Sequence, residues 1–407
     1  MIRQIIDYVK YDIGWIPFVC AFLMLDKNLA FKIPFLHEIV NIILLVIPLY
    51  LMSRFELPKL DKLTSVFLII SLLSLLLNNV NPVFHAYERL MLFTLLLLSF
   101  SPLLQSDCAR EFRAKVFVMV LWGAVLISVI SFFCYFLGIN YMKIEGGSYL
   151  LNKAGTFGGI TTQSMALGPI SGIATLFMTY QAFETSKKIY WLCAALCAAS
   201  VLFAASRSAF IATVIGELAI VYTYSSSKTA VLKKIVPIVL ILCVSYPLWN
   251  SALDGLQKKN HSELSNGIDI ASRANKWDSR LEEFKDSPLI GIGFVTVSER
   301  DYYDINTGII EPGSSWLATL SMTGILGFIV FCVMYFRGIH RTLKNQIKAN
   351  RMVGCILILL GIHMIAEGHI FSAGAFLCFM VWITIGVATD SRDIDIQDLL
   401  PKSMFFD

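Results

Sequence analysis

The sequence predicts an all-α polytopic membrane protein with about 12 transmembrane helices. Its 407 residues are 57% hydrophobic and only 15% charged, with a mean hydropathy of +0.70, whereas soluble domains carry about 25% charged residues. Apolar stretches of about 20 residues recur, and each can cross a hydrocarbon core of roughly 30 Å. The alternating polarity of short barrel strands is not found. We therefore expect a single transmembrane domain over residues 1–407.

Each apolar stretch is a candidate span, and the polar breaks between them are short with one exception. The first span is the weakest, because it contains Pro17 and few apolar residues. Spans seven and eight are expected to form a tight hairpin around Ser206, Arg207 and Ser208. The candidate spans cover about 12–30, 36–52, 63–79, 87–104, 114–138, 160–183, 189–205, 207–224, 232–250, 314–336, 352–370 and 374–389.

Lysine and arginine residues indicate the orientation, because short cytoplasmic loops of membrane proteins are enriched in them. With a cytoplasmic N-terminus, the cytoplasmic segments hold 20 of the 33 basic residues and the short outer loops hold six. The other seven lie in a long loop, where the rule does not apply. We predict a multi-pass membrane protein with both termini in the cytoplasm; in a Gram-negative cell it would span the inner (cytoplasmic) membrane, and its outward side would be the periplasm. The net charge of +4 does not indicate a nucleic-acid partner.

A polar segment over residues 251–313 is the one long break, and the orientation places it in the periplasm. Spacings of three and four between apolar residues predict a short amphipathic helix over residues 273–286, with Ser272 as its N-cap. The helix should end before Pro288, and the glycines of residues 289–294 indicate a sharp re-entry towards the membrane. We expect the segment to form a lid and one wall of a site. The apolar stripe of the helix consists of Ala274, Trp277, Leu281 and Phe284.

Two arginines stand at helix starts near the outer membrane surface. Arg207 opens span eight, and Arg273 lies in the first turn of the predicted loop helix. The start of a helix carries partial positive charge, so a cation there is out of place unless an anion joins it. Guanidinium groups bind phosphate in bidentate fashion and backbone N–H groups add donors, which suits a phosphate or diphosphate. Alternatively, Arg207 reaches lipid head groups and Arg273 is a solvated surface residue.

Three ionisable residues within the spans are further candidates. Glu217 lies ten residues into span eight, about 15 Å deep at 1.5 Å per residue, where such groups face the bundle interior and are often functional; alternatively, it is a protonated core residue. His363 and Glu367 share a helical face near the outer end of span eleven, close to His369. They would form an acid–base pair or fix the helix against a neighbour. A zinc site would need a third ligand, and no metal or cofactor is predicted.

Several short motifs follow one another between about residues 150 and 390. Each motif is weak alone, but their order, spacing and topology resemble the O-antigen ligase and O-antigen polymerase superfamily of bacterial surface-polysaccharide enzymes. The motifs are Gly155-Thr156-Phe157-Gly158-Gly159, Ser206-Arg207-Ser208-Ala209, Ser272-Arg273 with Trp277, Ser287-Pro288-Leu289-Ile290-Gly291-Ile292-Gly293-Phe294, Ser314-Ser315-Trp316-Leu317 and Thr323-Gly324-Ile325-Leu326-Gly327.

This resemblance implies a metal-independent glycosyltransferase that uses a glycan carried by undecaprenyl diphosphate at the periplasmic face. A hydroxyl of the acceptor attacks the anomeric carbon, and the lipid diphosphate, held by two arginines, leaves. The implied partners are the undecaprenyl-diphosphate-linked oligosaccharide, the lipid bilayer and a chain-length regulator protein of the same pathway. The implied substrate-binding residues are Arg207, Arg273, Ser206, Ser208, Trp277 and Ser314.

The sequence departs from the ligase pattern at one position. Ligases of the superfamily carry a His-Asn or His-Ser pair just before the tenth span, where this chain has Gly313. We therefore favour an O-antigen polymerase, which extends a glycan at the non-reducing end of a new lipid-linked repeat unit during lipopolysaccharide biosynthesis. The alternatives are a ligase that transfers the glycan to lipid A core, and a flippase or exporter of lipid-linked glycans. The candidate bases are Glu311, which is nearest in sequence, and Glu367, His363, Asp301 and Asp304.

Overall fold

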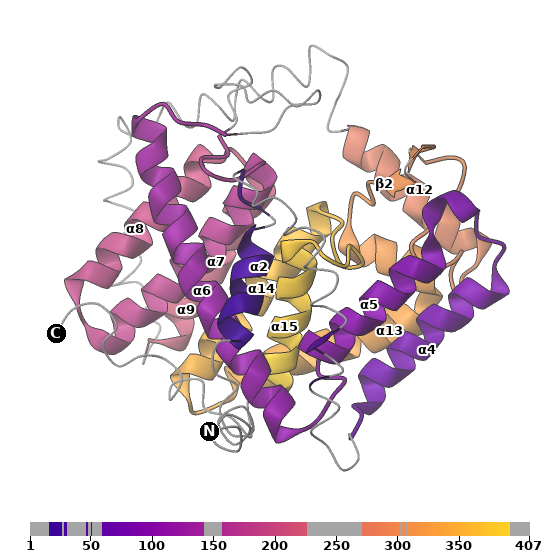
Figure 1. Cartoon of the computed structure of the whole chain (residues 1–407), viewed down its shortest axis with the longest axis horizontal. Coiled ribbons are helices and arrows are strands. Elements are labelled where there is room, and N and C mark those ends of the chain that lie inside the picture. Colours follow the sequence, from indigo (N-terminus) through magenta and orange to yellow (C-terminus); the bar gives the residue numbers. More distant parts are fainter. Residues whose placement is uncertain are drawn as a thin grey trace, which may run out of the picture.

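The computed structural model describes residues 16–26, 28–30, 46–47, 50, 59–141, 157–225, 271–301, 303–306 and 308–390. Its regular structure is helical apart from one hairpin, in which β1 (Tyr303–Asp304) pairs with β2 (Ile309–Ile310) in antiparallel fashion. In Figure 1, α6 to α9 gather on one side, α4, α5, α12 and α13 on the other, and α2, α14 and α15 lie between them. The helices are α2 (Ile16–Asp26), α4 (Lys62–Leu77), the 3-10 turn Pro82–Phe84, α5 (Ala86–Phe100), α6 (Asp107–Phe136), α7 (Ser164–Thr185), α8 (Lys188–Phe203), α9 (Arg207–Thr223), α12 (Ala271–Asp286), α13 (Ser315–Leu343), α14 (Lys348–Ala366) and α15 (Phe376–Asp390).

Ten of the expected spans coincide with helices in the described part of the chain. The short connection between α8 and α9 is present, but these two helices pack mainly against α7 and not against each other as a tight hairpin would. Span 232–250, and all of span 36–52 except residues 46, 47 and 50, lie outside the described residues, so the number of twelve spans stays a prediction. By length and composition alone, four described helices are long and apolar enough to cross a membrane. They are Pro82–Phe100, Asp107–Phe136, Ser315–Leu343 and Lys348–Ala366.

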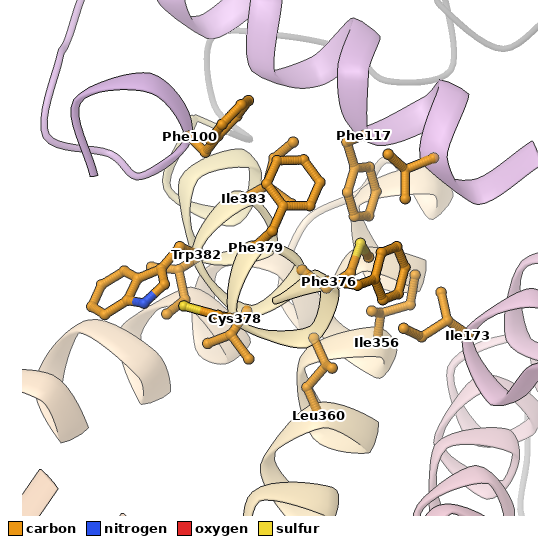
Figure 2. Packing of buried hydrophobic residues seen from close by; sticks show 14 of the residues in the cluster. Phe100, Phe117, Ile173, Ile356, Leu360, Phe376, Cys378, Phe379, Trp382 and Ile383 are labelled. Atoms are coloured by element: carbon orange, nitrogen blue, oxygen red, sulfur yellow. The ribbon is translucent and has the colours of Figure 1, made fainter. Parts of the chain in front are cut away.

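The centre of the bundle is α15, which is buried on every side. Every residue of Cys378–Ala388 is buried, as expected for a helix that is apolar all round. Figure 2 shows Trp382, Phe379 and Phe376 leaving α15 in different directions, each towards other parts of the bundle. The Phe379 ring lies 4.5 Å from that of Phe100 on α5. Because α15 packs against α2, α5, α6, α13 and α14, it joins the two sides of the molecule.

A buried ion pair fixes the last residue of α15. Arg113 on α6 has no exposed surface, and its Nε and Nη2 donate to Asp390 Oδ2 at 2.9 and 2.7 Å. Its Nη1 donates to the Leu104 carbonyl oxygen at 2.9 Å. Gly386 permits this approach, because a Cβ there would lie 2.7 Å from the Phe100 carbonyl oxygen and 2.9 Å from the Arg113 side chain. Since a buried charge is tolerated only when it is paired and hydrogen-bonded, Arg113 holds α15 against α6.

Helix α13 is broken in its first half, at Gly324. This residue has φ 65° and ψ −174° inside the helix, a conformation that glycine adopts far more readily than other residues. The re-entrant segment, residues 287–293 directly after α12, packs into the break. Ile292 N–H donates to the Ser321 carbonyl oxygen at 2.9 Å, and Ile325 N–H donates back to the segment at 2.9 Å. The segment meets α13 about 13 Å from the helix start at 1.5 Å per residue, and the expected direction of this turn, towards the membrane, stays a prediction.

Two glycines let these backbones touch. A Cβ on Gly324 would overlap the backbone of the re-entrant segment, and a Cβ on Gly291, which has φ 79°, would overlap the backbone of Met322. Polar residues of α4 bond to the same region: Ser74 Oγ donates to the Met322 carbonyl oxygen at 2.6 Å, and Asn78 Nδ2 donates to that of Gly291 at 3.0 Å. Irregular backbone at this depth needs protein partners, because hydrocarbon supplies none.

Helix α12 confirms the predicted loop helix, but its start and its buried face differ from expectation. It covers Ala271–Asp286, so Ser272 lies within the helix instead of capping it. The apolar stripe, expected to rest on the protein, is only partly covered. Its exposed members are Ala274 and Leu281, and its half-buried members are Trp277 and Phe284.

The side chains that α12 buries most deeply are charged. Arg280 and Glu283 have no exposed surface. Arg280 Nη1 donates to Glu283 Oε2 at 2.8 Å, its Nη2 donates to Asp301 Oδ2, and Glu283 Oε1 accepts from Ser298 N–H at 2.8 Å. Burial raises the pKa of Glu283, and the Arg280 guanidinium opposes this rise. The network ties α12 to the chain that follows the re-entrant segment, and helical periodicity alone does not reveal such partners.

Replacing Gly324 by alanine is expected to destabilise the protein by about 4 kcal/mol or more, because the new Cβ overlaps the re-entrant segment. Gly138→Ala is the matched control, since Gly138 has φ 69° but no atom within 4 Å of an added Cβ. The control should lose only about 1–2 kcal/mol for the unfavourable φ. Thermal unfolding of the purified proteins in detergent compares the two, and equal losses would contradict the backbone contact.

Arg280→Ala is expected to destabilise the outer loop by about 3–5 kcal/mol, because it strips two buried carboxylates of their cation. Arg300→Ala is the matched control: Arg300 forms an exposed pair with Glu282 at 3.4 Å, and exposed pairs contribute about 0–1 kcal/mol. Hydrogen exchange of the α12 amides measures the difference. Unchanged protection of α12 in Arg280→Ala would show that the buried network does not hold the helix.

Candidate functional site

The starts of α9 and α13 and the end of α14 meet around Glu367. This residue follows α14 directly, and its extended backbone (φ −135°, ψ 134°) ends that helix. Its carbonyl oxygen accepts from the N–H and Oγ of Ser315 on α13 at 3.0 and 2.7 Å. Its carboxylate accepts from Ser208 Oγ, in the first turn of α9, at 3.4 Å. The backbone of Glu367 is therefore held firmly, while its carboxylate faces the start of α9.

The first turns of α7 and α9 lie side by side near this point. Gly168 on α7 permits the contact, because a Cβ there would lie 2.9 Å from Ala209 Cβ and 3.1 Å from Ser206 Cβ. The N-cap residues of the two helices, Gln163 and Ser206, make no side-chain capping bond. Instead, Ser206 Oγ lies 3.4 Å from Ser208 Oγ. First-turn N–H groups without a side-chain cap carry partial positive charge and suit an anion.

Of the two arginines predicted to bind phosphate, one is placed at this cluster. Arg207 is the first residue of α9, is exposed, and stands between Ser206 and Ser208 in the chain. Arg273 is the third residue of α12, but its side chain lies outside the described part of the structure. The convergence of both guanidinium groups on one diphosphate therefore stays a prediction.

The predicted residues of the long loop form a second contact, between α12 and the chain before α13. Trp277 Nε1 donates to the Gly313 carbonyl oxygen at 3.4 Å. Gly313 has φ 72°, and a Cβ there would lie 2.9 Å from the Lys276 side chain. Lys276 also forms an ion pair with Glu311, whose side chain is 65% exposed. Glu311 thus faces solvent and a cation, whereas Glu367 lies beside the start of α9.

Three further candidate site residues form hydrogen bonds or ion pairs with neighbouring parts of the structure. Ser314 is buried, caps the first turn of α13, and donates to the Met364 carbonyl oxygen at 3.2 Å. Asp301 belongs to the buried network of α12. Asp304 accepts from a backbone N–H of the β1–β2 turn at 2.9 Å.

Glu217 and His363 lie deeper in the bundle. Glu217 accepts from Thr179 Oγ1 on α7 at 3.1 Å, so its carboxylate faces a neighbouring helix. His363 is buried, and its ring centroid is 5.4 Å from that of His369. Because α14 ends before Glu367, the helical spacing that was expected to place His363 and Glu367 on one face does not extend that far. Within the described residues, no three His, Cys, Asp or Glu side chains form a group able to hold a metal ion.

A cavity of about 620 Å³ adjoins this cluster. Gly368, the neighbour of Glu367 in the chain, lines it, together with residues from α5, α7, α13 and the start of α15. Described residues of the long loop therefore line this cavity, whereas the expectation that the loop forms a lid over a site stays a prediction. These loop residues are Val295, Ile309, Ile310 and Pro312.

Arg89 is the one charged side chain among the described residues that line the cavity. It is not among the site residues predicted from the sequence. It lies in the first turn of α5, and its Nη2 donates to the Gly308 carbonyl oxygen at 3.1 Å. A Cβ on Gly308 (φ 62°) would overlap the Val83 carbonyl group, and the rings of Phe84 and Tyr303 lie 5.0 Å apart. The β1–β2 hairpin thus rests on the turn before α5, next to which it is seen in Figure 1.

Comparison with known proteins finds one family that part of the chain resembles. The Wzy_C family model, described as O-Antigen ligase, matches residues 192–332. The matched stretch includes Arg207, Arg273 and Gly313, whereas Glu367 and Arg89 lie outside it. No curated protein matches the chain. The match confirms the resemblance drawn from the motifs: over residues 192–332 the chain is similar to the O-antigen ligase family.

Proposed function

We propose that the chain is a polysaccharide polymerase of the bacterial inner membrane. It transfers a growing glycan from undecaprenyl diphosphate to the non-reducing end of a new undecaprenyl-diphosphate-linked repeat unit. The site faces the periplasm, both termini face the cytoplasm, and a chain-length regulator acts with the enzyme. The family match supports this proposal because it covers both arginines that the donor diphosphate requires.

The first turn of α9 supports a site for the donor diphosphate. The adjacent starts of α7 and α9 present partial positive charge together, and Arg207 adds a full charge beside them. Groups that are in place before the reaction stabilise negative charge as it develops on a leaving group, since they need no reorganisation. We assign Arg273, in the first turn of α12, as the second ligand of the same diphosphate.

Glu367 is the base in this proposal. Its carboxylate lies 3.4 Å from Ser208 Oγ, a long hydrogen bond of the kind that unliganded catalytic sites often show, and Ser315 fixes its backbone. The acceptor oxygen bonds to the anomeric carbon, the carbon–oxygen bond to the diphosphate breaks with its electron pair on the diphosphate, and the hydroxyl proton passes to Glu367. Glu311 is the alternative base, but it is exposed and paired with Lys276.

Gly313 is the observation that carries the choice of polymerase over ligase. Ligases of the superfamily place a histidine here, whereas Gly313 has φ 72° and packs against Lys276. Any side chain at this position would be strained and would press on α12. A ligase is the second candidate, because the matching family is described by that activity. A flippase is less well supported, because Arg207, Arg273 and Glu367 lie at the ends of helices instead of along a path through the bundle.

Liposomes that contain the purified protein and lipid-linked repeat units, without lipid A core, are expected to yield a ladder of glycans on a gel. Arg207→Ala should slow the reaction by about 10²–10³, the cost of removing one group that stabilises the developing charge. Arg300→Ala is the matched control: this exposed arginine lies in the outer loop, away from the proposed site, and the ladder should persist.

A ladder that appears only after lipid A core is added would make the chain a ligase. In cells, Arg207→Ala or Arg273→Ala should cause lipid-linked repeat units to accumulate on the outer face of the membrane. Accumulation on the inner face would instead support the flippase.

Glu367→Gln is expected to lower kcat by about 10²–10⁴ with little change in KM, because the amide keeps the shape but does not accept the proton. Glu282→Gln, an exposed carboxylate on α12, is the control and should keep its rate. Steady-state rates with lipid-linked repeat units measure both. A rate that falls in Glu311→Gln and not in Glu367→Gln would transfer the role of base to Glu311.

A further inference from the structure

The cavity next to Glu367 has a chemistry that the donor diphosphate does not explain. Part of its wall is apolar, and the rest offers two amide and two hydroxyl side chains beside Arg89. Amides and hydroxyls both donate and accept hydrogen bonds, as sugar hydroxyls do, and the apolar wall matches the C–H faces of a sugar ring. A volume of about 620 Å³ is ordinary for a small-molecule site. The amide and hydroxyl residues are Asn28, Gln163, Thr162 and Ser372.

Arg89 adds a charged group that only donates. Of its five N–H donors, one bonds to the Gly308 carbonyl oxygen within the described structure, and no described carboxylate lies within ion-pair distance of it. The described lining of the cavity contains no Asp or Glu. A ligand that satisfies this lining therefore combines hydroxyl groups with a carboxylate or phosphate.

The position of the cavity indicates which substrate it takes. Glu367 contacts Ser208 at the start of α9, while its neighbour Gly368 lines the cavity and packs so closely on Pro312 that a Cβ would lie 2.5 Å away. Arg207 does not line the cavity. The cavity and the proposed diphosphate site share the start of α7, through Gln163 and Ala166, but the arginine at each site is a different residue. An acceptor bound against Gly368 would lie beside the residue proposed as the base.

We propose that this cavity is the acceptor subsite, and that it takes an acidic sugar at the non-reducing end of the acceptor. Arg89 binds the carboxylate or phosphate of that sugar and so selects acceptors that carry one. The Gly308 carbonyl oxygen aims the guanidinium, because the β1–β2 hairpin rests on the turn before α5. This inference rests on the proposed function, and Arg89 acts in it as a binding residue that determines specificity.

The test measures binding by isothermal titration calorimetry, using the full chain in detergent micelles. The probes are a disaccharide that contains glucuronate, the same disaccharide with glucose in its place, and inorganic diphosphate. The wild-type protein should bind the acidic disaccharide more tightly than the neutral one. Arg89→Gln should weaken binding of the acidic disaccharide by about tenfold or more and leave the neutral disaccharide and diphosphate unchanged. Arg207→Gln should weaken diphosphate alone.

Each outcome separates the acceptor subsite from the donor site. Equal affinity of the wild type for the two disaccharides, or no binding of the acidic one, would overturn the proposal. It would also be overturned if Arg89→Gln weakened diphosphate and spared the acidic disaccharide, since Arg89 would then belong to the diphosphate site. If diphosphate bound neither the wild type nor any variant, the result would count against the proposed donor site alone. The two disaccharides would still test the role of Arg89. The unfolding temperature of Arg89→Gln serves as the control that this variant is folded.

Discussion

The backbone contact between Gly324 in the break of α13 and the re-entrant segment anchors the described part of the long loop. Helix α12 ends at the residue before this segment, and the chain after it leads through Val295 to the β1–β2 hairpin. Both parts of the loop therefore depend on one fixed point in the bundle. Two further features keep that point in place: the absence of a side chain at Gly291, and the hydrogen bonds from Ser74 and Asn78 on α4. Moving the segment would move α12 and one wall of the cavity together.

The charged residues of the described loop pair with one another, whereas Glu367 lies apart from them. Within the described loop, Arg280 holds two buried carboxylates and Lys276 pairs with Glu311. The acidic groups of these contacts are therefore held by cations of the loop itself. Glu367 is placed instead beside the start of α9, with the wall of the cavity at its neighbour Gly368. In the proposed function, the cations at α9 and α5 would bind two different anions, the donor diphosphate and an acidic acceptor sugar.

The sequence predicts the helices well and the site only in part, for physical reasons. Apolar runs of about 20 residues have the length of a helix that crosses a bilayer, so they predict the positions of helices in the described part of the chain. The apolar periodicity of α12 predicts a helix but does not predict that its charged face is buried. Arg280 on that face pairs with Asp301, which follows the re-entrant segment and cannot be located from the periodicity of α12. The break of α13 depends on the φ of Gly324, which residue type alone does not set. In the sequence, Arg89 cannot be distinguished from other basic loop residues, because its contact with Gly308 of the β1–β2 hairpin is known only from the structure.

A cryo-EM map of the full chain with undecaprenyl diphosphate bound tests most directly whether Arg207 and Arg273 bind one diphosphate. We predict that the phosphates lie between Arg207, in the first turn of α9, and Arg273, in the first turn of α12, and that the cavity beside Arg89 holds no phosphate. Phosphates bound at Arg89, or at Arg207 with Arg273 turned away to solvent, would contradict it.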